Sequence, residues 1–90
     1  MASYRVRWKK SAQKELKRLN KDLILKILEF VGNLSEDPFP DGCRKLRGSQ
    51  HTYRFRIGDY RVVYDVQSDI LTIEIIRIGH RKEIYRRLTQ

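Results

Sequence analysis

The chain is poor in the residues that build cross-linked or metal-bound folds. Its 90 residues include one cysteine, Cys43, and two histidines. An internal disulfide framework is therefore excluded, and a zinc site of Cys and His ligands is not expected. No apolar run approaches the roughly 18–20 residues that span a bilayer, and the first five residues lack the apolar core of a secretory signal. We expect a single cytoplasmic domain over residues 1–90, with no metal, no cofactor and no membrane contact.

Acidic residues are also scarce. Eleven Asp and Glu stand against 20 Lys and Arg, which gives a formal net charge of +9. The excess is greatest in residues 1–30, which hold nine basic residues and three acids. The partners expected of so basic a domain are nucleic acid, an anionic membrane surface or an acidic protein. Hydrophobic residues at 40% and charged residues at 34% are typical of a globular domain.

Two kinds of periodicity divide the chain. Residues 4–8 alternate apolar and basic side chains, which predicts a strand. Residues 11–19 and 23–34 carry apolar stripes at helical spacing, with Ser11 as the expected cap of the first helix. Asn20 is placed to end the first helix and start the second, so the two should form an antiparallel hairpin.

Beyond a proline-containing loop at residues 36–42, the pattern changes to strands. Residues 53–57 and 60–66 alternate around Gly58-Asp59, a two-residue hairpin turn. Residues 70–78 are rich in β-branched residues and nearly apolar on both faces, which indicates a central strand. The order predicts an α+β fold: an N-terminal strand, an antiparallel helical hairpin packed on an antiparallel β-sheet of about four strands, and a short C-terminal helical tail.

The register of the predicted hairpin gathers arginines on one face. Arg56 should lie opposite Arg61, with Arg54 on the same face. Like charges so opposed cost a few tenths to ~1 kcal/mol. A bound polyanion reverses that cost, and guanidinium groups bind phosphate through two parallel hydrogen bonds. The alternative is that these arginines are solvated, with nearby acids as counter-charges.

Residues 77–87 form a second basic cluster. His80 is its natural proton shuttle, because histidine is the side chain that most readily exchanges a proton near neutral pH. Tyr85 either stacks on an exposed base or packs against apolar neighbours. Among the acids, only Asp65 and Glu74 could meet across strands, and both can be explained as salt-bridge partners of nearby basic residues. The chain has no Gly-x-Ser-x-Gly nucleophile motif and no glycine-rich phosphate loop.

Three segments resemble the RelE branch of the RelE/ParE toxin superfamily. They contain Lys-Leu-Arg-Gly (45–48), Gly-Asp-Tyr-Arg-Val-Val-Tyr (58–64) and Gly-His-Arg-Lys-Glu-Ile-Tyr (79–85), in the family's order and spacing. The resemblance covers nearly the whole chain. It implies a microbial-RNase-like fold and the toxin of a type II toxin-antitoxin system. The implied activity is that of a ribosome-dependent endoribonuclease, which cleaves mRNA in the A site and so inhibits translation.

The same resemblance implies the chemistry and the partners. Attack by the RNA's own 2′-OH on the adjacent phosphate needs no metal. The implied partners are the 70S ribosome with its mRNA and an acidic, RelB-like antitoxin. The toxin itself would be a monomer that forms a hetero-oligomer with the antitoxin.

The resemblance also implies roles for single residues. Arg61 and Arg81 match arginines that stabilise the transition-state phosphate, and Tyr85 matches a tyrosine that stacks on the mRNA base or helps proton transfer. Arg54 and Arg56 fall where the best-known member carries lysines. Arginine stays protonated at neutral pH and is therefore a poor proton acceptor. The expected catalytic set is Arg54, Arg56, Arg61, His80, Arg81 and Tyr85, with His80 as the candidate base. The expected RNA-binding set is Lys9, Lys10, Lys14, Lys17, Arg18, Lys45 and Arg47.

Two other functions stay open. A ParE-like inhibitor of DNA gyrase has the same fold and need not keep the arginines. An inactive relative that binds RNA is also compatible with the replacement of lysines by Arg54 and Arg56.

Overall fold

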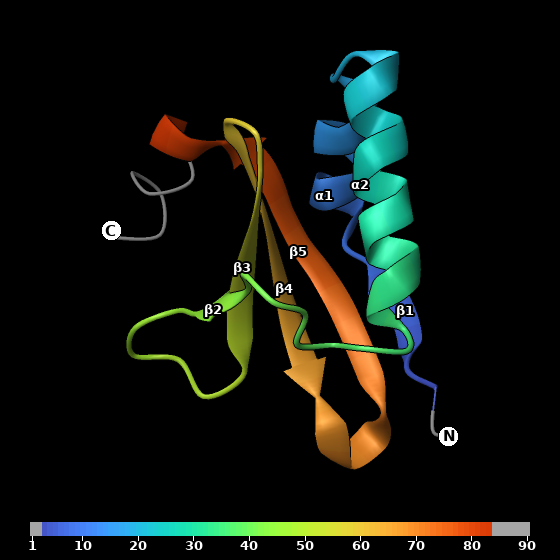
Figure 1. Ribbon diagram of the computed structural model, residues 1–90, viewed down its shortest axis with the longest axis vertical. Helices are drawn as coiled ribbons and strands as arrows, with labels where there is room; N and C mark the ends of the chain where they lie inside the picture. Colours follow the sequence, from blue (N-terminus) through green and yellow to red (C-terminus); the bar gives the residue numbers. More distant parts are fainter. Residues whose placement is uncertain (1–2, 84–90) are drawn as a thin grey trace.

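A five-stranded sheet with a helical pair on one face forms the described part of the chain, residues 3–83, in the computed structural model (Figure 1). The strand order is β1-β5-β4-β3-β2. The elements are β1 (Arg5–Trp8), α1 (Lys10–Lys17), α2 (Lys21–Leu34), β2 (Arg44–Lys45), β3 (Thr52–Ile57), β4 (Tyr60–Gln67), a 3-10 turn (Ser68–Ile70) and β5 (Thr72–His80). This confirms the α+β class and the predicted order of helices and strands.

The sheet differs from the prediction in two ways. It has five strands because the two-residue β2 pairs with β3. It is also mixed, because β1 runs parallel to β5, from Arg5 opposite Thr72 to Trp8 opposite Ile75. A strand of two residues is too short to show a period, and alternation within β1 says nothing about which distant strand it joins or in which direction.

The helical hairpin is confirmed, with a correction at its start. α1 runs away from β1, and α2 returns beside it (Figure 1). Lys9 caps α1 without a side-chain hydrogen bond, so Ser11 is inside the helix and not its cap. Asn20 does cap α2, because its Oδ1 accepts a hydrogen bond from the Leu23 amide at 2.9 Å. Within residues 3–83, neither helix has the length and apolar character to cross a membrane.

The core lies between the helices and the sheet. Tyr64 is its largest fully buried side chain. The Tyr64 hydroxyl donates a hydrogen bond to the Pro38 carbonyl at 3.2 Å, which ties the proline loop to β4. Phe30 of α2 stacks on Phe55 of β3 with ring centroids 4.1 Å apart. The buried cluster consists of Ala12, Ile27, Val31, Leu34, Val62, Tyr64, Val66, Ile73, Ile75 and Ile78.

A β-bulge in β5 changes which side chains face the helices. Val63 pairs with Arg77, but the next residue, Tyr64, pairs with Ile75, so Ile76 is an extra residue. Ile75 and Ile78 therefore both face the helices, whereas Arg77 lies on the other face of the sheet.

Residues 81–83 begin a helical turn after β5. The Arg81 amide donates to the Asp59 carbonyl at 2.9 Å, which holds this turn beside the β3–β4 hairpin. The rest of the predicted C-terminal tail, Tyr85 included, lies outside the described residues.

Candidate functional site

The face of the sheet that points away from the helices, here the outer face, carries two rows rich in arginine. In one row the paired residues are Arg44, Arg54, Val63 and Arg77, on β2, β3, β4 and β5. In the next row, toward the hairpin turn, they are Arg56, Arg61 and Gly79. The predicted hairpin register is thus confirmed, including Arg56 opposite Arg61. We call Arg44, Arg54, Arg56, Arg61 and Arg77 the arginine face.

The turn of the hairpin holds two of these arginines. Gly58 has a φ of +60°, a conformation that suits glycine in a two-residue turn. Its carbonyl accepts hydrogen bonds from Arg56 Nε at 3.1 Å and from Arg61 Nη1 at 3.5 Å. Arg61 Nη1 also donates to the Tyr60 carbonyl at 3.2 Å. Negative carbonyl ends therefore offset part of the repulsion between the two guanidinium groups.

Arg61 and Arg56 differ in exposure. Only 6% of Arg61 is exposed, whereas Arg56 is an exposed residue. A guanidinium fixed by backbone carbonyls is held in place before any ligand arrives, so it loses little conformational entropy on binding. Arg61 is therefore the preorganised cation of the arginine face.

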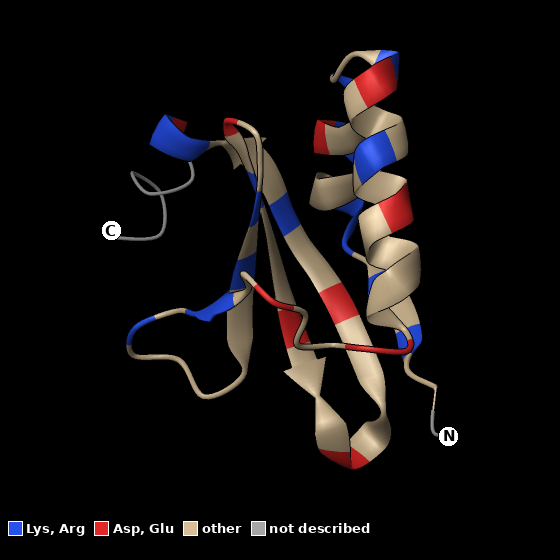
Figure 2. Ribbon diagram, viewed as in Figure 1, with Lys and Arg blue, Asp and Glu red and all other residues tan. Residues whose placement is uncertain are grey.

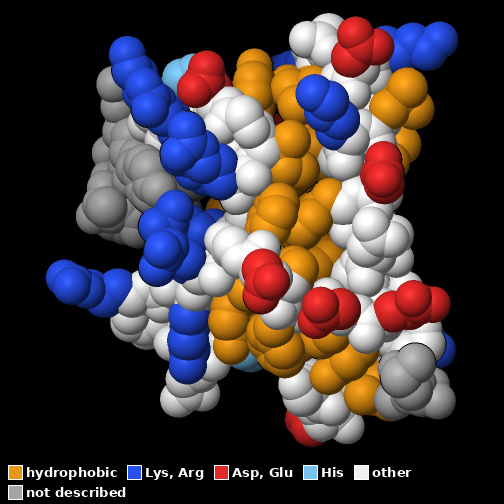
Figure 3. Space-filling view, in the orientation of Figure 1, with side chains coloured by type: hydrophobic (Ala, Val, Ile, Leu, Met, Phe, Trp, Pro, Cys, Tyr) orange, Lys and Arg blue, Asp and Glu red, His pale blue; other side chains and the backbone are white. Residues whose placement is uncertain are grey.

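The opposite end of the outer face is acidic. Its next row pairs Thr52, Asp65, Glu74 and Arg7. Asp65 and Glu74 lie opposite each other, as predicted, and Thr52 Oγ1 donates to Asp65 Oδ1 at 2.6 Å. Figure 2 shows the acidic segments of β4 and β5 below the basic ones of β3 and β5, and Figure 3 shows Lys and Arg side chains gathered on the sheet side of the molecule. A polyanion is thus attracted more strongly to the hairpin end of the face than to the other end, where Asp65 and Glu74 offset the charges of Arg7 and Arg5.

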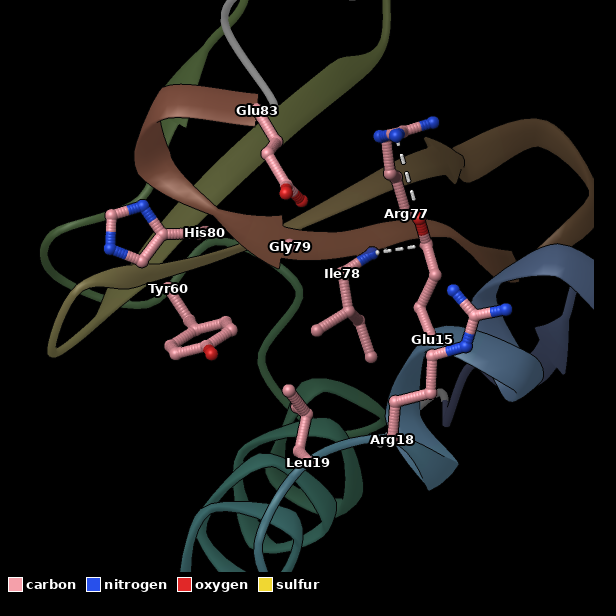
Figure 4. A pocket seen from close by; sticks show the side chains of 9 residues that line it. All are labelled: Glu15, Arg18, Leu19, Tyr60, Arg77, Ile78, Gly79, His80 and Glu83. Carbon is pink, nitrogen blue, oxygen red and sulfur yellow. Dashed lines mark hydrogen bonds and ion pairs between the residues drawn. The ribbon is translucent and has the colours of Figure 1, made fainter.

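His80 lies on the other side of the sheet. It pairs with Tyr60, whose ring meets the imidazole edge to face with centroids 5.6 Å apart. Its Nδ1 accepts a hydrogen bond from the Lys82 amide at 3.4 Å. Both rings line a cavity of about 260 Å³ between β5 and the end of α1 (Figure 4). His80 thus lies on the face opposite to that of Arg61 and Arg56, although it lines the same cavity as Arg77. Its role as a base stays a prediction.

The remaining predicted residues divide into three places. The residues of the predicted RNA-binding set that belong to the helical hairpin are all exposed, and they lie on or beside α1: Lys9, Lys10, Lys14, Lys17 and Arg18. Lys45 pairs with Tyr53, which places it on the helix side of β2, and exposed Arg47 follows β2 in a loop. Arg81 is exposed beside the hairpin. On β2 it is therefore Arg44, and not Lys45, that joins the arginine face.

Arg44 and Arg77 are the members of the arginine face missing from the predicted site. Nothing in the sequence marks Arg44 as part of a strand. Strict alternation from Ile73 and Ile75 would point Arg77 toward the helices, among apolar residues. A charged residue at a position that alternation buries was the available signal of a bulge.

The arginine face offers phosphate binding rather than metal ligation. A guanidinium group donates two parallel hydrogen bonds to phosphate oxygens, and several together stabilise developing negative charge. Within residues 3–83, no three His, Cys, Asp or Glu side chains are grouped so that they could hold a metal ion.

Known proteins resemble this chain in fold and in sequence. A family model described as the ParE toxin of the type II toxin-antitoxin system parDE matches residues 6–85. The chain is 34% identical over 85 residues to toxin RelG of Mycobacterium tuberculosis, covering 93% of this chain and 98% of RelG. It is 35% identical over 80 residues to the putative toxin RelE1 of Methanocaldococcus jannaschii, covering 86% and 89%.

Solved structures agree. The archaeal RelE-RelB complex from Pyrococcus horikoshii matches with a TM-score of 0.80 and 36% identity, over 88% of this chain and 96% of that one. The toxin-antitoxin complex RelBE2 of Mycobacterium tuberculosis matches with a TM-score of 0.76 and 31% identity, over 88% and 99%. The chain therefore belongs to the RelE family of toxins from type II toxin-antitoxin systems, which confirms the resemblance found in the sequence.

Proposed function

We propose that this protein is a ribosome-dependent endoribonuclease that cleaves mRNA in the ribosomal A site. The observation that carries the proposal is Arg61, a buried guanidinium fixed by the Tyr60 and Gly58 carbonyls within a face of five arginines. Such a face is suited to bind the negatively charged phosphate at which an RNA chain is cleaved, more than to bind a neutral substrate.

The reaction needs little beyond positioning and charge. The RNA 2′-OH gives its proton to solvent water, and its oxygen bonds to the adjacent phosphorus. The bond from phosphorus to the 5′ oxygen breaks, and that oxygen takes up a proton. Negative charge grows on the phosphate in between, where Arg61 and Arg81 stabilise it while Arg54 and Arg56 bind the RNA backbone. Arginines stay protonated near pH 7, so their part is electrostatic, and the ribosome sets the geometry of attack.

The exposed basic residues of α1 extend this surface to ribosomal RNA. Lys10, Lys14 and Lys17 lie on one short helix, and Lys9 and Arg18 flank it. Each phosphate that they neutralise releases counterions, so binding to the ribosome should weaken as salt rises.

The proposed second partner is an acidic antitoxin that neutralises a monomeric toxin in the cytoplasm. Two features support it. The chain carries a net charge of +9, and apolar side chains lie exposed between α2 and the sheet (Figure 3). A disordered acidic segment that folds on binding would contact the basic surface with its charges and the apolar surface with its hydrophobic side chains.

Inhibition of DNA gyrase is the second candidate function. The match of residues 6–85 to the ParE toxin model favours it. It would require a protein surface and no RNA chemistry, so the arginine face would have no part in toxicity.

Expression without an antitoxin separates the two candidates. We expect growth arrest, with discrete in-frame cuts in mRNA mapped by primer extension, and we expect Arg61→Ala or Arg81→Ala to abolish both. Arg5→Ala is the matched control, because Arg5 is exposed on the same face at the acidic end. Intact mRNA with damaged DNA would favour the gyrase inhibitor. If Arg61→Ala and Arg81→Ala still arrested growth, the assignment of the site would be contradicted. If the wild-type protein caused no arrest and no cuts, an inactive relative would be favoured.

A further inference from the structure

Arg77 occupies the β5 end of the arginine face. The bulge at Ile76 turns it outward, opposite Val63 and in line with Arg54. Its diagonal neighbour on β4 is Arg61, and such neighbours typically lie ~7–8 Å apart. The β5 residue paired with Arg61 is Gly79, which has no side chain. The space between the two guanidinium groups is thus not filled by a side chain of β5.

Arg77 is held by a residue from outside the sheet. The pairing of β1 with β5 ends at Trp8 and Ile75. Beyond that point Glu15 of α1 reaches β5, and Figure 4 shows its carboxylate beside Ile78 and Arg77. One carboxylate oxygen accepts a hydrogen bond from the Ile78 amide at 2.9 Å, and the other lies 3.5 Å from Arg77 Nη2. The Arg77 and Glu15 side chains are 20% and 22% exposed. Glu15 is therefore fixed by a backbone amide, whereas Arg77 is held by one long ion pair.

The Arg77 guanidinium is incompletely satisfied in this arrangement. Its Nε is buried and has no hydrogen-bond partner among residues 3–83. A guanidinium carries five N–H donors, and a phosphate accepts two of them at once from Nε and one Nη. The 260 Å³ cavity lined by Glu15, Arg77 and Gly79 leaves room beside the strand for such an anion.

We propose that Arg77 is a further phosphate contact for RNA, and that an RNA phosphate replaces the Glu15 carboxylate as its partner in the complex. Glu15 then acts as a counter-ion in the free protein, which keeps Arg77 at the edge of the arginine face until RNA binds. The choice of RNA as the anion rests on the proposed function, but the binding event itself needs neither the ribosome nor cleavage.

The first test measures binding of a labelled single-stranded RNA oligonucleotide to the full-length protein over a range of salt concentrations. Arg77→Gln should weaken binding several-fold and lower the slope of log K against log salt by about 0.7, the loss of one phosphate contact. Arg5→Gln, which removes an exposed arginine at the acidic end of the same face, should leave the slope unchanged. Equal slopes for wild type and Arg77→Gln, in variants with unchanged circular dichroism, would overturn the proposal.

The second test uses Glu15→Gln, whose amide oxygen still accepts from the Ile78 amide. We expect RNA affinity to rise a few-fold, and we expect most of that gain to disappear when Arg77→Gln is also present. The same gain in both backgrounds would mean that Glu15 acts through net charge alone, and would contradict its role as the competitor for Arg77.

The outcomes separate this inference from the proposed function. If the protein cuts no mRNA but the binding slopes change as described, the endoribonuclease proposal fails and the Arg77 contact stands. If mRNA is cut but Arg77→Gln binds RNA like the wild type, only the Arg77 contact fails.

Discussion

The two faces of the sheet perform different tasks, although they come from the same strands. On β4, Val62, Tyr64 and Val66 face the helices with at most 3% of their surface exposed. The alternate residues Arg61, Val63 and Asp65 lie on the outer face, and two of the three are charged. One strand thus contributes to the core with every second residue and to the outer face with the others. Stability and chemistry should therefore respond to different substitutions.

The largest expected effect is on the helix-facing side. Ile73→Ala removes a fully buried side chain and should lower the free energy of unfolding by about 2–5 kcal/mol, measured by urea denaturation. Ile70→Ala is the control, because Ile70 is 60% exposed. It should change that free energy by less than about 0.5 kcal/mol. Similar losses from both would show that the helix-facing side is not the core.

Tyr64 tests the same face through one hydrogen bond. Tyr64→Phe leaves the Pro38 carbonyl without its donor and should cost about 1 kcal/mol of unfolding free energy. Burial also raises the pKa of Tyr64 above the ordinary tyrosine value of about 10.

The pKa of Tyr64 gives this variant a second signature. Above pH ~10 the unfolded chain releases the phenolic proton, but the folded protein retains it. Stability should be unaffected by this group below that pH, and should then fall by up to ~1.4 kcal/mol per pH unit until the folded-state pKa is reached. Urea denaturation between pH 9 and pH 11 should show a shallower fall in Tyr64→Phe, and parallel curves would contradict the burial of this hydroxyl.

The smallest effect compares two charges on the outer face. Arg56 lies opposite Arg61, whereas Arg7 lies beside Glu74. Arg56→Gln should raise the free energy of unfolding by a few tenths of a kcal/mol, and Arg7→Gln should lower it by about as much. High salt should shrink both changes because it screens exposed charges. Changes of the same sign in urea denaturation would show that the cross-strand neighbours do not set the energies.

The sequence predicted part of the difference between the two faces of the sheet, and it did so from local signals. Gly58-Asp59 and the alternation on either side fix the hairpin register, and with it the shared face of Arg54, Arg56 and Arg61. Asn20 marked the start of α2 in the same local way. Both features depend on residues a few positions apart, which a single sequence records directly.

Contacts between distant segments could not be predicted from the single sequence. The parallel pairing of β1, the bulge at Ile76 and the pairing of Arg44 with Arg54 arise when strands meet in the folded chain. The bulge matters most for the site, because it brings Arg77 to the arginine face. The face on which His80 lies was hidden for a related reason: it depends on the pairing of His80 with Tyr60, which the local basic cluster does not reveal.

The most direct measurement of the central claim is the rate at which purified protein cleaves mRNA in the A site of programmed ribosomes. The proposed role of Arg61 predicts that Arg61→Ala lowers this rate by about 10²–10³, as expected when one fixed donor to a charged transition state is lost. Arg5→Ala should cleave at the rate of the wild type. A wild-type rate in folded Arg61→Ala would contradict the account.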